Sequence, residues 1–476
     1  MYLIYGARAT NIIRIWGEVM SISEIIMYNP WWNNSIDTGT LVKDLTEQYE
    51  NANFKRDYSN LFDLSSNALY TLRGMRQIGK STALKVTIAR LLKKKIPRKS
   101  IMFLPSDTVA NFKELREVLV EYLNYARKYK KRYIFIDEIS YVKDWQRAIK
   151  ELRDNTVLRN DLMLLSGSSA LDIKRGAERM PGRRGNVIEP DKVLLPVTFR
   201  EYLEITGFKN LPSFSLNELL TLDEKHTFDF KILENEINSI FDSFLLSGGI
   251  PVVIEKTIQD ESPEQLVNVF WDIMVGDIEK VGLNRITFRK IIKYLANRIG
   301  SRLSWNSIGS EIELDTKTVQ RYLEAIASNY LGFVIYFLDK NKHTIKPLKQ
   351  KKIYLWDSFL NTVIQKKLGV STKIPELVEQ LVGKELLIRY ENNLSEGCYM
   401  PENVGFWYSQ TGNEVDYLPR NIPIEVKYKN NVSKGDAITI TKAFGKGILL
   451  TKKTIDLSSP IKRIPVSLFL AVLSIS

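Results

Sequence analysis

The feature that most constrains this chain is the run from Gly74 to Ser81, which reads Gly-Met-Arg-Gln-Ile-Gly-Lys-Ser. It matches the phosphate-binding pattern GxxxxGK[ST], in which backbone N–H groups wrap a phosphate at a helix N-terminus. An apolar run at 68–72 predicts a strand before it, and residues 82–92 have the apolar spacing of a helix. This context favours a P-loop over a chance glycine turn. The residues predicted to bind nucleotide are Gly74, Arg76, Gln77, Ile78, Gly79, Lys80, Ser81 and Thr82.

A second motif supplies the carboxylates that ATP hydrolysis needs. Residues 133–136 are apolar and mostly β-branched or aromatic, and they run directly into Asp137 and Glu138. Such a run predicts a buried parallel strand with its chemistry at the carboxyl end. We expect Lys80 to reach the β- and γ-phosphates, Ser81 and Asp137 to hold Mg²⁺, and Glu138 to orient or deprotonate the attacking water.

Two further polar groups are predicted to complete this site. A third strand, 161–165, ends at Ser166-Gly167-Ser168, where either Ser166 or Ser168 can sense the γ-phosphate or simply form a turn. The pair Arg183 and Arg184 follows in a glycine-rich turn. One of these arginines can act as a finger in a neighbouring subunit of a homo-oligomer, or both can form a solvated basic turn.

The composition limits which partners, metal ligands and disulfides the chain can have. A length of 476 residues predicts several domains, and a net charge of +13 indicates a polyanionic partner or a lysine-rich proteome. The single cysteine, Cys398, excludes an internal disulfide and fits a reducing cytoplasm. Because there are only two histidines, metal sites must rest on carboxylates, which favours Mg²⁺ or Mn²⁺. No run is apolar for long enough to span a bilayer, so we expect no membrane association.

The pattern along the chain predicts an α/β protein with five parts. Alternating strand-like and helix-like segments predict a parallel-sheet P-loop core, and a helix-rich region after it reads as a lid over the nucleotide or as a connector. The expected divisions are an N-terminal arm at 1–60, the ATPase core at 61–196, the lid at 197–284, a winged helix at 285–358 and a last domain at 359–476.

The winged-helix prediction rests on two helices followed by a basic hairpin. Asp315 or Thr316 caps a helix whose apolar stripe leaves Lys317 and Arg321 facing outward. Two strand-like runs, 333–338 and 352–356, flank the lysines Lys340, Lys342, Lys346, Lys349 and Lys351. This order places a helix in the major groove of double-stranded DNA and lysines on phosphates, although winged helices also serve as protein spacers.

The last domain carries a second set of chemical groups. Residues 413–418 and 422–428 read as adjacent strands joined by a tight turn, which brings Asp416 to Glu425 and Lys427. Asp416 and Glu425 would hold a divalent metal that activates water against a phosphodiester, Lys427 would steady the developing charge, and Glu379 could add a ligand. The alternative is an ordinary solvated pair of strands.

Several motifs together resemble an archaeal and bacterial family of AAA-type P-loop ATPases with a C-terminal PD-(D/E)xK nuclease-like domain. The resemblance rests on Asn29-Pro30-Trp31-Trp32, the segments 76–81 and 136–138, Ser166 to Ser169, Gly182-Arg183 and the segment 196–202. It implies an AAA-type core, a winged helix and a restriction-endonuclease-like α/β fold at the end. Asp416, Glu425 and Lys427 match the nuclease motif, with Val415 where that motif has a proline.

The sequence therefore predicts an ATP-hydrolysing, Mg²⁺-dependent and DNA-associated cytoplasmic protein with a possible metal-dependent nuclease site. The competing hypothesis is an ATP-controlled signalling or scaffold switch whose nuclease-like part is inactive. These two hypotheses differ in whether DNA stimulates ATP hydrolysis and whether Asp416 has a chemical role.

Overall fold

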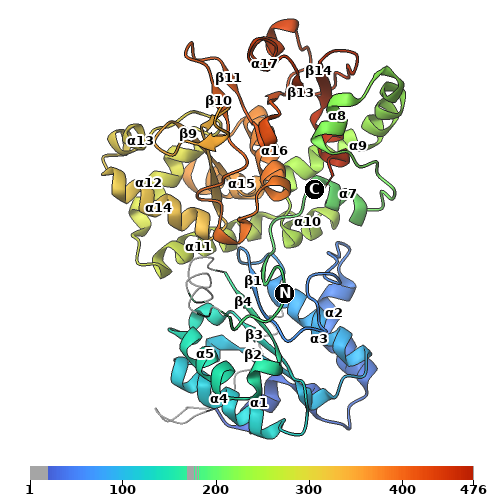
Figure 1. Ribbon diagram of the computed structural model, residues 1–476, viewed down its shortest axis with the longest axis vertical. Helices are drawn as coiled ribbons and strands as arrows, with labels where there is room; N and C mark the ends of the chain where they lie inside the picture. The colour runs from blue at the N-terminus through green and yellow to red at the C-terminus, as the bar shows by residue number, and fades with distance from the viewer. Residues whose placement is uncertain (1–19, 169–175, 177–179, 181, 475–476) are drawn as a thin grey trace.

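The computed structural model describes residues 20–168, 176, 180 and 182–474. Figure 1 shows two lobes along the long axis, with β1–β4 in the lower lobe and the helices from α7 onward in the upper lobe. In the described residues no helix is both long and apolar enough to span a membrane.

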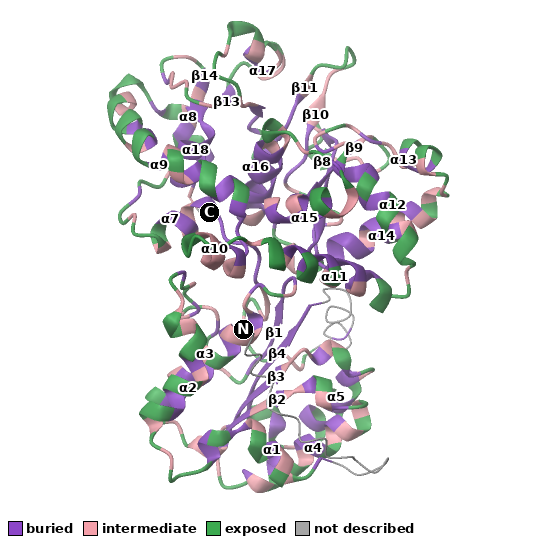
Figure 2. Ribbon diagram, turned by 180° about the vertical axis from the view of Figure 1, so that it is seen from behind, coloured by how far each residue is buried: buried purple, intermediate pink, exposed green. Residues whose placement is uncertain are grey.

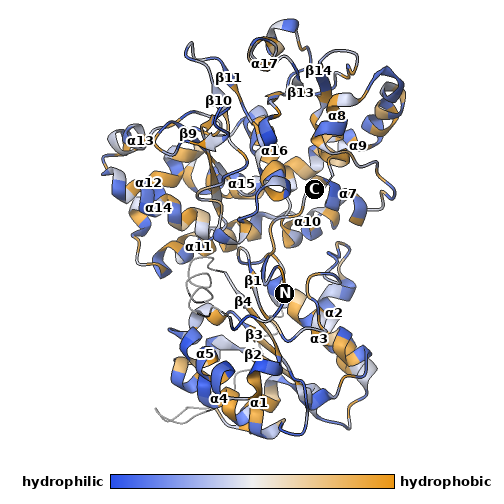
Figure 3. Ribbon diagram, viewed as in Figure 1, coloured by the Kyte–Doolittle hydropathy of each residue, from blue (hydrophilic) through white to orange (hydrophobic). Residues whose placement is uncertain are grey.

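The lower lobe is built on a five-stranded parallel sheet with the order β2-β3-β4-β1-β5. Helices α2 and α3 lie on one side of this sheet and α1, α4 and α5 on the other (Figure 1). Because both faces are covered, the strands are continuous apolar runs, and Figures 2 and 3 show them as largely buried and hydrophobic. The prediction of an α/β core with a parallel sheet is confirmed. The strands are β1 Leu69–Arg73, β2 Ile101–Pro105, β3 Tyr133–Asp137, β4 Leu162–Gly167 and β5 Asp191–Val193, and the helices are α1 Ile22–Tyr28, α2 Thr38–Asn51, α3 Lys80–Lys93, α4 Phe112–Tyr125 and α5 Trp145–Asn155.

The N-terminal segment covers the β2 edge of this sheet. Both tryptophan indoles, of Trp31 and Trp32, donate to the Ile101 carbonyl at 2.9 and 2.7 Å. The Asn29 side chain exchanges two hydrogen bonds with the backbone of Phe103. These contacts satisfy the outward-facing backbone groups of β2, so the edge strand presents no free ladder to other chains.

The upper lobe begins with the helices of residues 199–280. Three further helices, between residues 285 and 328, and an antiparallel ribbon follow. The ribbon pairs β6 with β9 and ends in the short β7–β8 hairpin. This order is the one expected of a winged helix, and the identification stays a prediction. The elements are α7 Phe199–Ile205, α8 Leu216–Thr221, α9 Thr227–Ser247, α10 Pro251–Ile258, α11 Glu264–Lys280, α12 Arg285–Ala296, α13 Trp305–Ile312, α14 Thr316–Ser328, β6 Gly332–Tyr336, β7 Leu338–Asp339, β8 Thr344–Ile345 and β9 Lys351–Leu355.

One lysine of the expected basic hairpin is not available to phosphates. Lys351 is fully buried, with its amine 3.1 Å from the Pro347 carbonyl and 3.7 Å from the centre of the Trp305 ring. It begins β9, where it pairs with Tyr336 of β6 and so belongs to the interior of the ribbon.

The C-terminal part has a second parallel sheet of three strands, β12-β13-β14. The predicted hairpin of 413–418 with 422–428 is reduced to a single bridge, between Tyr417 and Ile424. Instead β11 pairs with β10, and β12 takes β13 as its parallel partner because its apolar residues belong to the core between sheet and helices. The elements are α15 Ser358–Leu368, α16 Ile374–Tyr390, β10 Trp407–Tyr408, β11 Glu414–Val415, β12 Ile424–Lys427, α17 Ile438–Phe444, β13 Gly447–Thr451, β14 Ile461–Pro465 and α18 Val466–Val472.

The last helix ties the C-terminal part to the predicted lid. Helix α18 packs against α7 and α9, and Phe214 exchanges backbone hydrogen bonds with Val472 and Ser474 at 2.8 and 2.9 Å. Glu385 of α16 also accepts from the Phe199 backbone at 2.9 Å. The segments 197–284 and 359–474 therefore share one packed interface, although they are far apart in the chain.

Candidate functional site

The loop between β1 and α3 has the backbone that its glycines predict. Gly74 and Gly79 have φ angles of 147° and 102°, which other residues rarely adopt. A Cβ atom at Gly74 would lie 2.2 Å from the Leu194 carbonyl oxygen, and one at Gly79 would lie 2.4 Å from the Tyr58 hydroxyl. Both positions thus require glycine. Ile78 is buried beneath the loop and anchors it.

Lys80 lies in the first turn of α3, and its amine contacts the P-loop backbone. Its amine donates to the carbonyls of Gly74 and Met75, both at 3.0 Å, and lies 3.4 Å from a Glu138 carboxylate oxygen. The side chain is only 4% exposed. A buried ammonium with one carboxylate and two carbonyls is only partly neutralised, so it can exchange these contacts for phosphate oxygens.

The strand order places Ser166 of β4, and Ser168 just after it, between the P-loop and the two acids. Because β4 lies between β1 and β3, Ser166 reaches Asp137 and Glu138. The Ser166 hydroxyl donates to the Asp137 carboxylate and accepts from the Glu138 backbone N–H at 3.0 Å. Ser168 contacts Glu138 through its backbone N–H, at 3.3 Å. The side chain of Ser166, rather than that of Ser168, therefore connects to the acidic pair; Ser169 lies outside the described residues.

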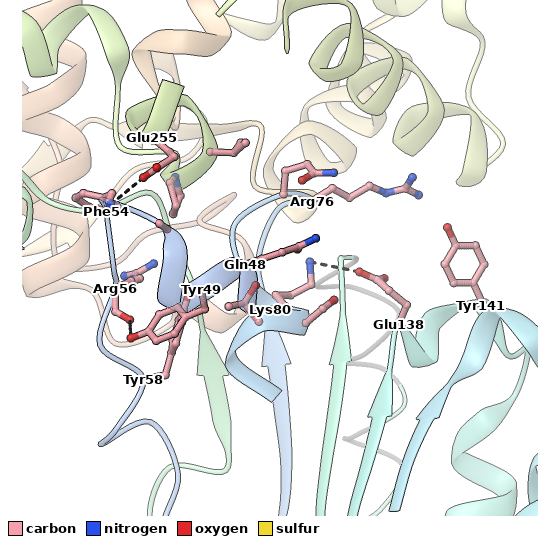
Figure 4. A pocket seen from close by; sticks show the side chains of 17 residues that line it. Gln48, Tyr49, Phe54, Arg56, Tyr58, Arg76, Lys80, Glu138, Tyr141 and Glu255 are labelled. Carbon is pink, nitrogen blue, oxygen red and sulfur yellow. Dashed lines mark hydrogen bonds and ion pairs between the residues drawn. The ribbon is translucent and has the colours of Figure 1, made fainter. Parts of the chain in front are cut away.

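A cavity of about 440 Å³ opens beside Lys80 (Figure 4). Gln77, Ser81 and Thr82 line it on the P-loop side, and Glu138 lines it on the β3 side. Its opposite wall comes from segments that carry no nucleotide-binding motif: the end of α2, the segment after it and the start of α10. These residues are Gln48, Tyr49, Ala52, Phe54, Arg56, Tyr58, Pro251, Val252 and Glu255.

The sequence predicted none of these wall residues individually, although α10 lies within the segment 197–284 that was expected to be a lid or a connector. Glu255 of α10 accepts backbone hydrogen bonds from Asn53 and Phe54, at 3.0 and 2.8 Å, which ties the upper lobe to the N-terminal segment. For the part of the wall at the end of α2 and after it, the aromatic residues Tyr49, Phe54 and Tyr58 were the available signal. Aromatic residues this close together are common in cores, so their pattern alone does not indicate a site.

The end of α11 contacts both nucleotide motifs. Arg76 of the P-loop pairs with Asp277 at 2.9 Å, and Lys280 donates to Ser140, which follows the acidic pair, at 3.3 Å. Asp277 is 2% exposed, and burial raises its pKa to about 6 against the opposing attraction of Arg76. Arg76 thus bridges to the upper lobe as well as lining the cavity.

The two candidate finger arginines form ion pairs within this chain. Arg183 pairs with Asp154, and Arg184 pairs with Asp191 at 2.6 Å beside the edge of the sheet. Asp191 also binds Arg73, whose guanidinium reaches the Ser395 carbonyl of the upper lobe at 2.7 Å. Arg184 therefore has a structural partner, and a role for either arginine in a neighbouring subunit stays a prediction.

The C-terminal acids and lysine come together, and a second lysine joins them. Val426 N–H donates to Asp416 at 2.9 Å, and Lys427 pairs with Glu425 at 2.5 Å. Lys352 of β9 places its amine 2.8 Å from both Asp416 and Glu379 and also pairs with Glu414. We call the six residues Lys352, Glu379, Glu414, Asp416, Glu425 and Lys427 the acid–lysine cluster.

Charge in this cluster is balanced internally. Burial, reinforced by the charge of Asp416, raises the pKa of Glu425 to about 8 and that of Glu379 to about 7. For Asp416 burial also acts to raise the pKa, but Lys352 and Lys427 outweigh it and the pKa lies below its ordinary value. The carboxylates in turn hold the pKa of Lys352 well above its ordinary value although its burial acts to lower it.

The two sites differ in their fit to a metal. Ser81 and Asp137 offer hydroxyl and carboxylate oxygens, which suit Mg²⁺ beside a nucleotide. In the acid–lysine cluster the carboxylates are the right ligands, but the Lys352 ammonium already contacts three of them. Within the described ranges no group of three or more histidine, cysteine, aspartate or glutamate residues is arranged to hold a metal ion.

Comparisons with known protein families cover two parts of the chain. Residues 66–203 match the model of an AAA domain, and residues 238–372 match a domain of unknown function, DUF8612. Residues 66–203 of the lower lobe are therefore similar to an AAA domain. Neither match describes residues after 372.

Two curated relatives are similar to more of the chain. MJ1637 of Methanocaldococcus jannaschii, an uncharacterized protein, is 27% identical over 316 residues, covering 63% of each chain. An uncharacterized protein of Haemophilus influenzae is 22% identical over 278 residues, 55% of this chain and 60% of that one. The chain thus spans less than two thirds of the length of these relatives.

Solved structures resemble the chain only loosely. The Walker-type ATPase PABY2304 of Pyrococcus abyssi is 13% identical with a TM-score of 0.39, over 69% of this chain and 95% of that one. The Orc1 protein of Aeropyrum pernix in complex with DNA is 12% identical with a TM-score of 0.27, over 69% and 91%. Both TM-scores lie below 0.5, so neither likeness supports a conclusion about this chain.

Proposed function

We propose that this chain binds and hydrolyses ATP with Mg²⁺. The observation that carries the proposal is the position of the Lys80 amine, between two P-loop carbonyls and the Glu138 carboxylate, at the wall of a cavity of about 440 Å³. The AAA-domain match over residues 66–203 supports it.

The residues divide the work as follows. Lys80 exchanges the Gly74 and Met75 carbonyls for the β- and γ-phosphates, and the backbone of the loop binds the phosphate chain. Ser81 and Asp137 hold Mg²⁺, which when bound neutralises phosphate charge. Glu138 orients the attacking water and accepts its proton. Ser166 holds the acidic pair in place.

The test is ATP turnover by the wild-type chain and by Lys80→Ala and Glu138→Gln variants. We expect turnover to disappear in both, with nucleotide binding lost only in Lys80→Ala. Turnover that survives Glu138→Gln would reject Glu138 as the base, and turnover that survives both would reject the proposal.

We further propose that the protein acts on double-stranded DNA in the cytoplasm, with the winged-helix segment 285–358 as one contact. The exposed cations Lys317, Arg321 and Lys342 and the net charge of +13 support this. The test is ATP turnover with and without duplex DNA at low and physiological salt. Stimulation that fades with salt is the expected result, and an unchanged rate would contradict it.

For the acid–lysine cluster two functions compete. The convergence of Asp416, Glu425 and Lys427 supports metal-dependent cleavage of DNA. The contact of Lys352 with three carboxylates supports the other function, an ATP-controlled switch in which this domain cuts nothing. Incubating duplex DNA with the chain and Mg²⁺ or Mn²⁺ separates them. Nicking that Asp416→Asn abolishes establishes cleavage; intact DNA with ATP turnover retained establishes the switch.

A further inference from the structure

The ends of the ATPase strands opposite the nucleotide site carry a dense basic surface. Segment 93–99 precedes β2 and segment 127–131 precedes β3; nine of their twelve residues are lysine or arginine and none is acidic. Arg159 precedes β4 and is exposed. We call segments 93–99 and 127–131 together with Arg159 the basic edge.

The sheet brings these segments side by side. Strands β2, β3 and β4 are neighbours in parallel register, with Ile101 opposite Tyr133 and Tyr133 opposite Leu162, so the segments before them emerge at one edge. The Tyr122 hydroxyl donates to the Lys99 carbonyl, which links α4 to the first segment. In Figure 1 this edge lies at the end of the lower lobe away from the upper lobe.

The cations of the basic edge form no ion pair with an acidic side chain among the described residues. Lys131 and Arg98 donate to backbone carbonyls, while Lys99 and Lys128 lie 5.0 and 5.2 Å from the centres of the Tyr125 and Tyr129 rings. Cations gathered without paired counter-charges repel one another, and a polyanion relieves that repulsion.

A groove beside the second segment gives the surface a shape. Its volume is about 550 Å³, and Arg127, Tyr129 and Lys130 line it. Val157, which is 52% exposed, also lines it. An apolar residue and an aromatic ring in the same groove as cations suit a sugar–phosphate backbone better than they suit a free inorganic anion.

Helix ends explain part of this charge but not all of it. Lysine and arginine are favoured in the last turn of a helix because they offset its dipole. That accounts for Lys93, at the end of α3. Arg159, in the last turn of the 3-10 helix at 157–160, fits the same explanation, but Lys130, five residues after α4 ends at Tyr125, does not.

We propose that the basic edge binds the phosphate backbone of double-stranded DNA. This rests on the proposed association with DNA and adds a contact surface separate from the winged-helix segment. The edge begins β3 while Asp137 ends it, so DNA would lie roughly one five-residue strand, ~16 Å, from the acidic pair. DNA bound there leaves the nucleotide cavity open.

The test compares pairs of charge reversals that change net charge equally. Lys128→Glu/Lys130→Glu alters the basic edge, Lys317→Glu/Lys342→Glu alters the winged-helix segment, and Lys225→Glu/Lys231→Glu is a control on exposed lysines of the upper lobe.

Affinity for a fluorescent duplex is measured by anisotropy across a salt series. We expect the basic-edge pair to weaken binding about tenfold or more. It should also make the negative slope of log affinity against log salt shallower by about 1.8, because two DNA phosphates would no longer be neutralised. Lys128→Arg/Lys130→Arg should retain affinity, and ATP turnover without DNA confirms folding.

Each other outcome has a distinct meaning. If the wild-type chain binds no duplex, both the association with DNA and this surface are rejected. If only the winged-helix pair weakens binding, or if the control pair weakens it equally, the basic edge is rejected while the association stands. If the basic-edge pair loses binding to phosphatidylserine vesicles and keeps its affinity for duplex, the surface binds membranes and the proposal is overturned.

Discussion

The nucleotide cavity and the acid–lysine cluster are built from the same groups and use them in opposite ways. In each, a nearly buried lysine lies beside one or more carboxylates. Lys80 contacts one carboxylate and two backbone carbonyls beside an open cavity. Lys352, 1% exposed, contacts the carboxylates of Glu379, Glu414 and Asp416.

The difference shows how neutralisation decides what a charged site can do. A lysine held mostly by carbonyls keeps much of its charge for an incoming anion, whereas a lysine surrounded by carboxylates is already paired. Breaking such a buried pair leaves uncompensated charges in a medium that solvates them poorly. The first arrangement is suited to binding, and the second holds two parts of the upper lobe together through its strands β9 and β11.

The sharpest test of the open site is Glu138→Gln. Loss of a general base lowers turnover by about 10²- to 10⁴-fold, while the amide keeps the shape of the side chain. Steady-state ATP hydrolysis measures it, with Glu121→Gln on the surface of α4 as the matched control. If turnover falls less than tenfold, the cavity does not use Glu138 and the contrast with the cluster loses its chemical basis.

Lys352→Met tests the closed site. Removing the ammonium leaves three carboxylates without their common partner, so we expect the free energy of unfolding to fall by about 3–5 kcal/mol. Urea unfolding measures this. The control is Lys351→Met, since the Lys351 amine contacts a carbonyl and the Trp305 ring but no carboxylate of the described residues.

Equal losses in the two lysine variants would mean that burial of the stem matters and the carboxylates do not. The difference between the stability losses of Lys352→Met and Lys351→Met should also shrink at low pH, because protonated carboxyls need no counter-ion. A Lys352→Met loss that is unchanged from pH 7 to pH 4.5 would contradict the account of the cluster.

Asp277→Asn probes the contact between the open site and the upper lobe. The folded pKa of about 6 lies above the ordinary value of 3.8, so the folded state binds the proton more tightly than the unfolded chain. The stability that this proton contributes is present at low pH and is lost as pH rises through about 6. The change in unfolding free energy caused by Asp277→Asn should therefore be more favourable at pH 7.5 than at pH 5, by roughly 1 kcal/mol.

Unfolding at the two pH values measures this difference. Asp272→Asn, an exposed position on the same helix, serves as the control and should show no such dependence. The groups that face Asp277 are Arg76, Lys280 and Lys80, which favour its charged form, and Glu138, which opposes it. Equal effects of Asp277→Asn at both pH values would place its pKa near the ordinary value.

The smallest effect is expected for Lys427→Met. This lysine belongs to the same cluster as Lys352, but its side chain is 37% exposed, so solvent already screens its pair with Glu425. We expect the free energy of unfolding to change by less than about 1 kcal/mol. A loss as large as that of Lys352→Met would show that the cluster is a single closed network; a small loss together with lost DNA nicking would show a chemical role.

The parts of the site that the sequence predicted are local or periodic. The P-loop is eight consecutive residues, Gly74 to Ser81, with a strand and a helix on either side, so its geometry follows from short-range backbone constraints. Asp137 and Glu138 follow an apolar run for the same reason. The approach of Asp416 to Glu425 and Lys427 was also predicted, although the hairpin expected to cause it is only a single bridge.

What sequence alone determined about this protein is thus the P-loop, the acidic strand end and the parallel α/β core, because each depends on neighbours in the chain. Only the tertiary structure decided that β4 brings Ser166 to Asp137, that Asp277 meets Arg76, and that Lys352 enters the acid–lysine cluster. These contacts join residues far apart in sequence. They form because packing a sheet and its helices around buried apolar surface fixes which strand ends meet, and no local pattern records that choice.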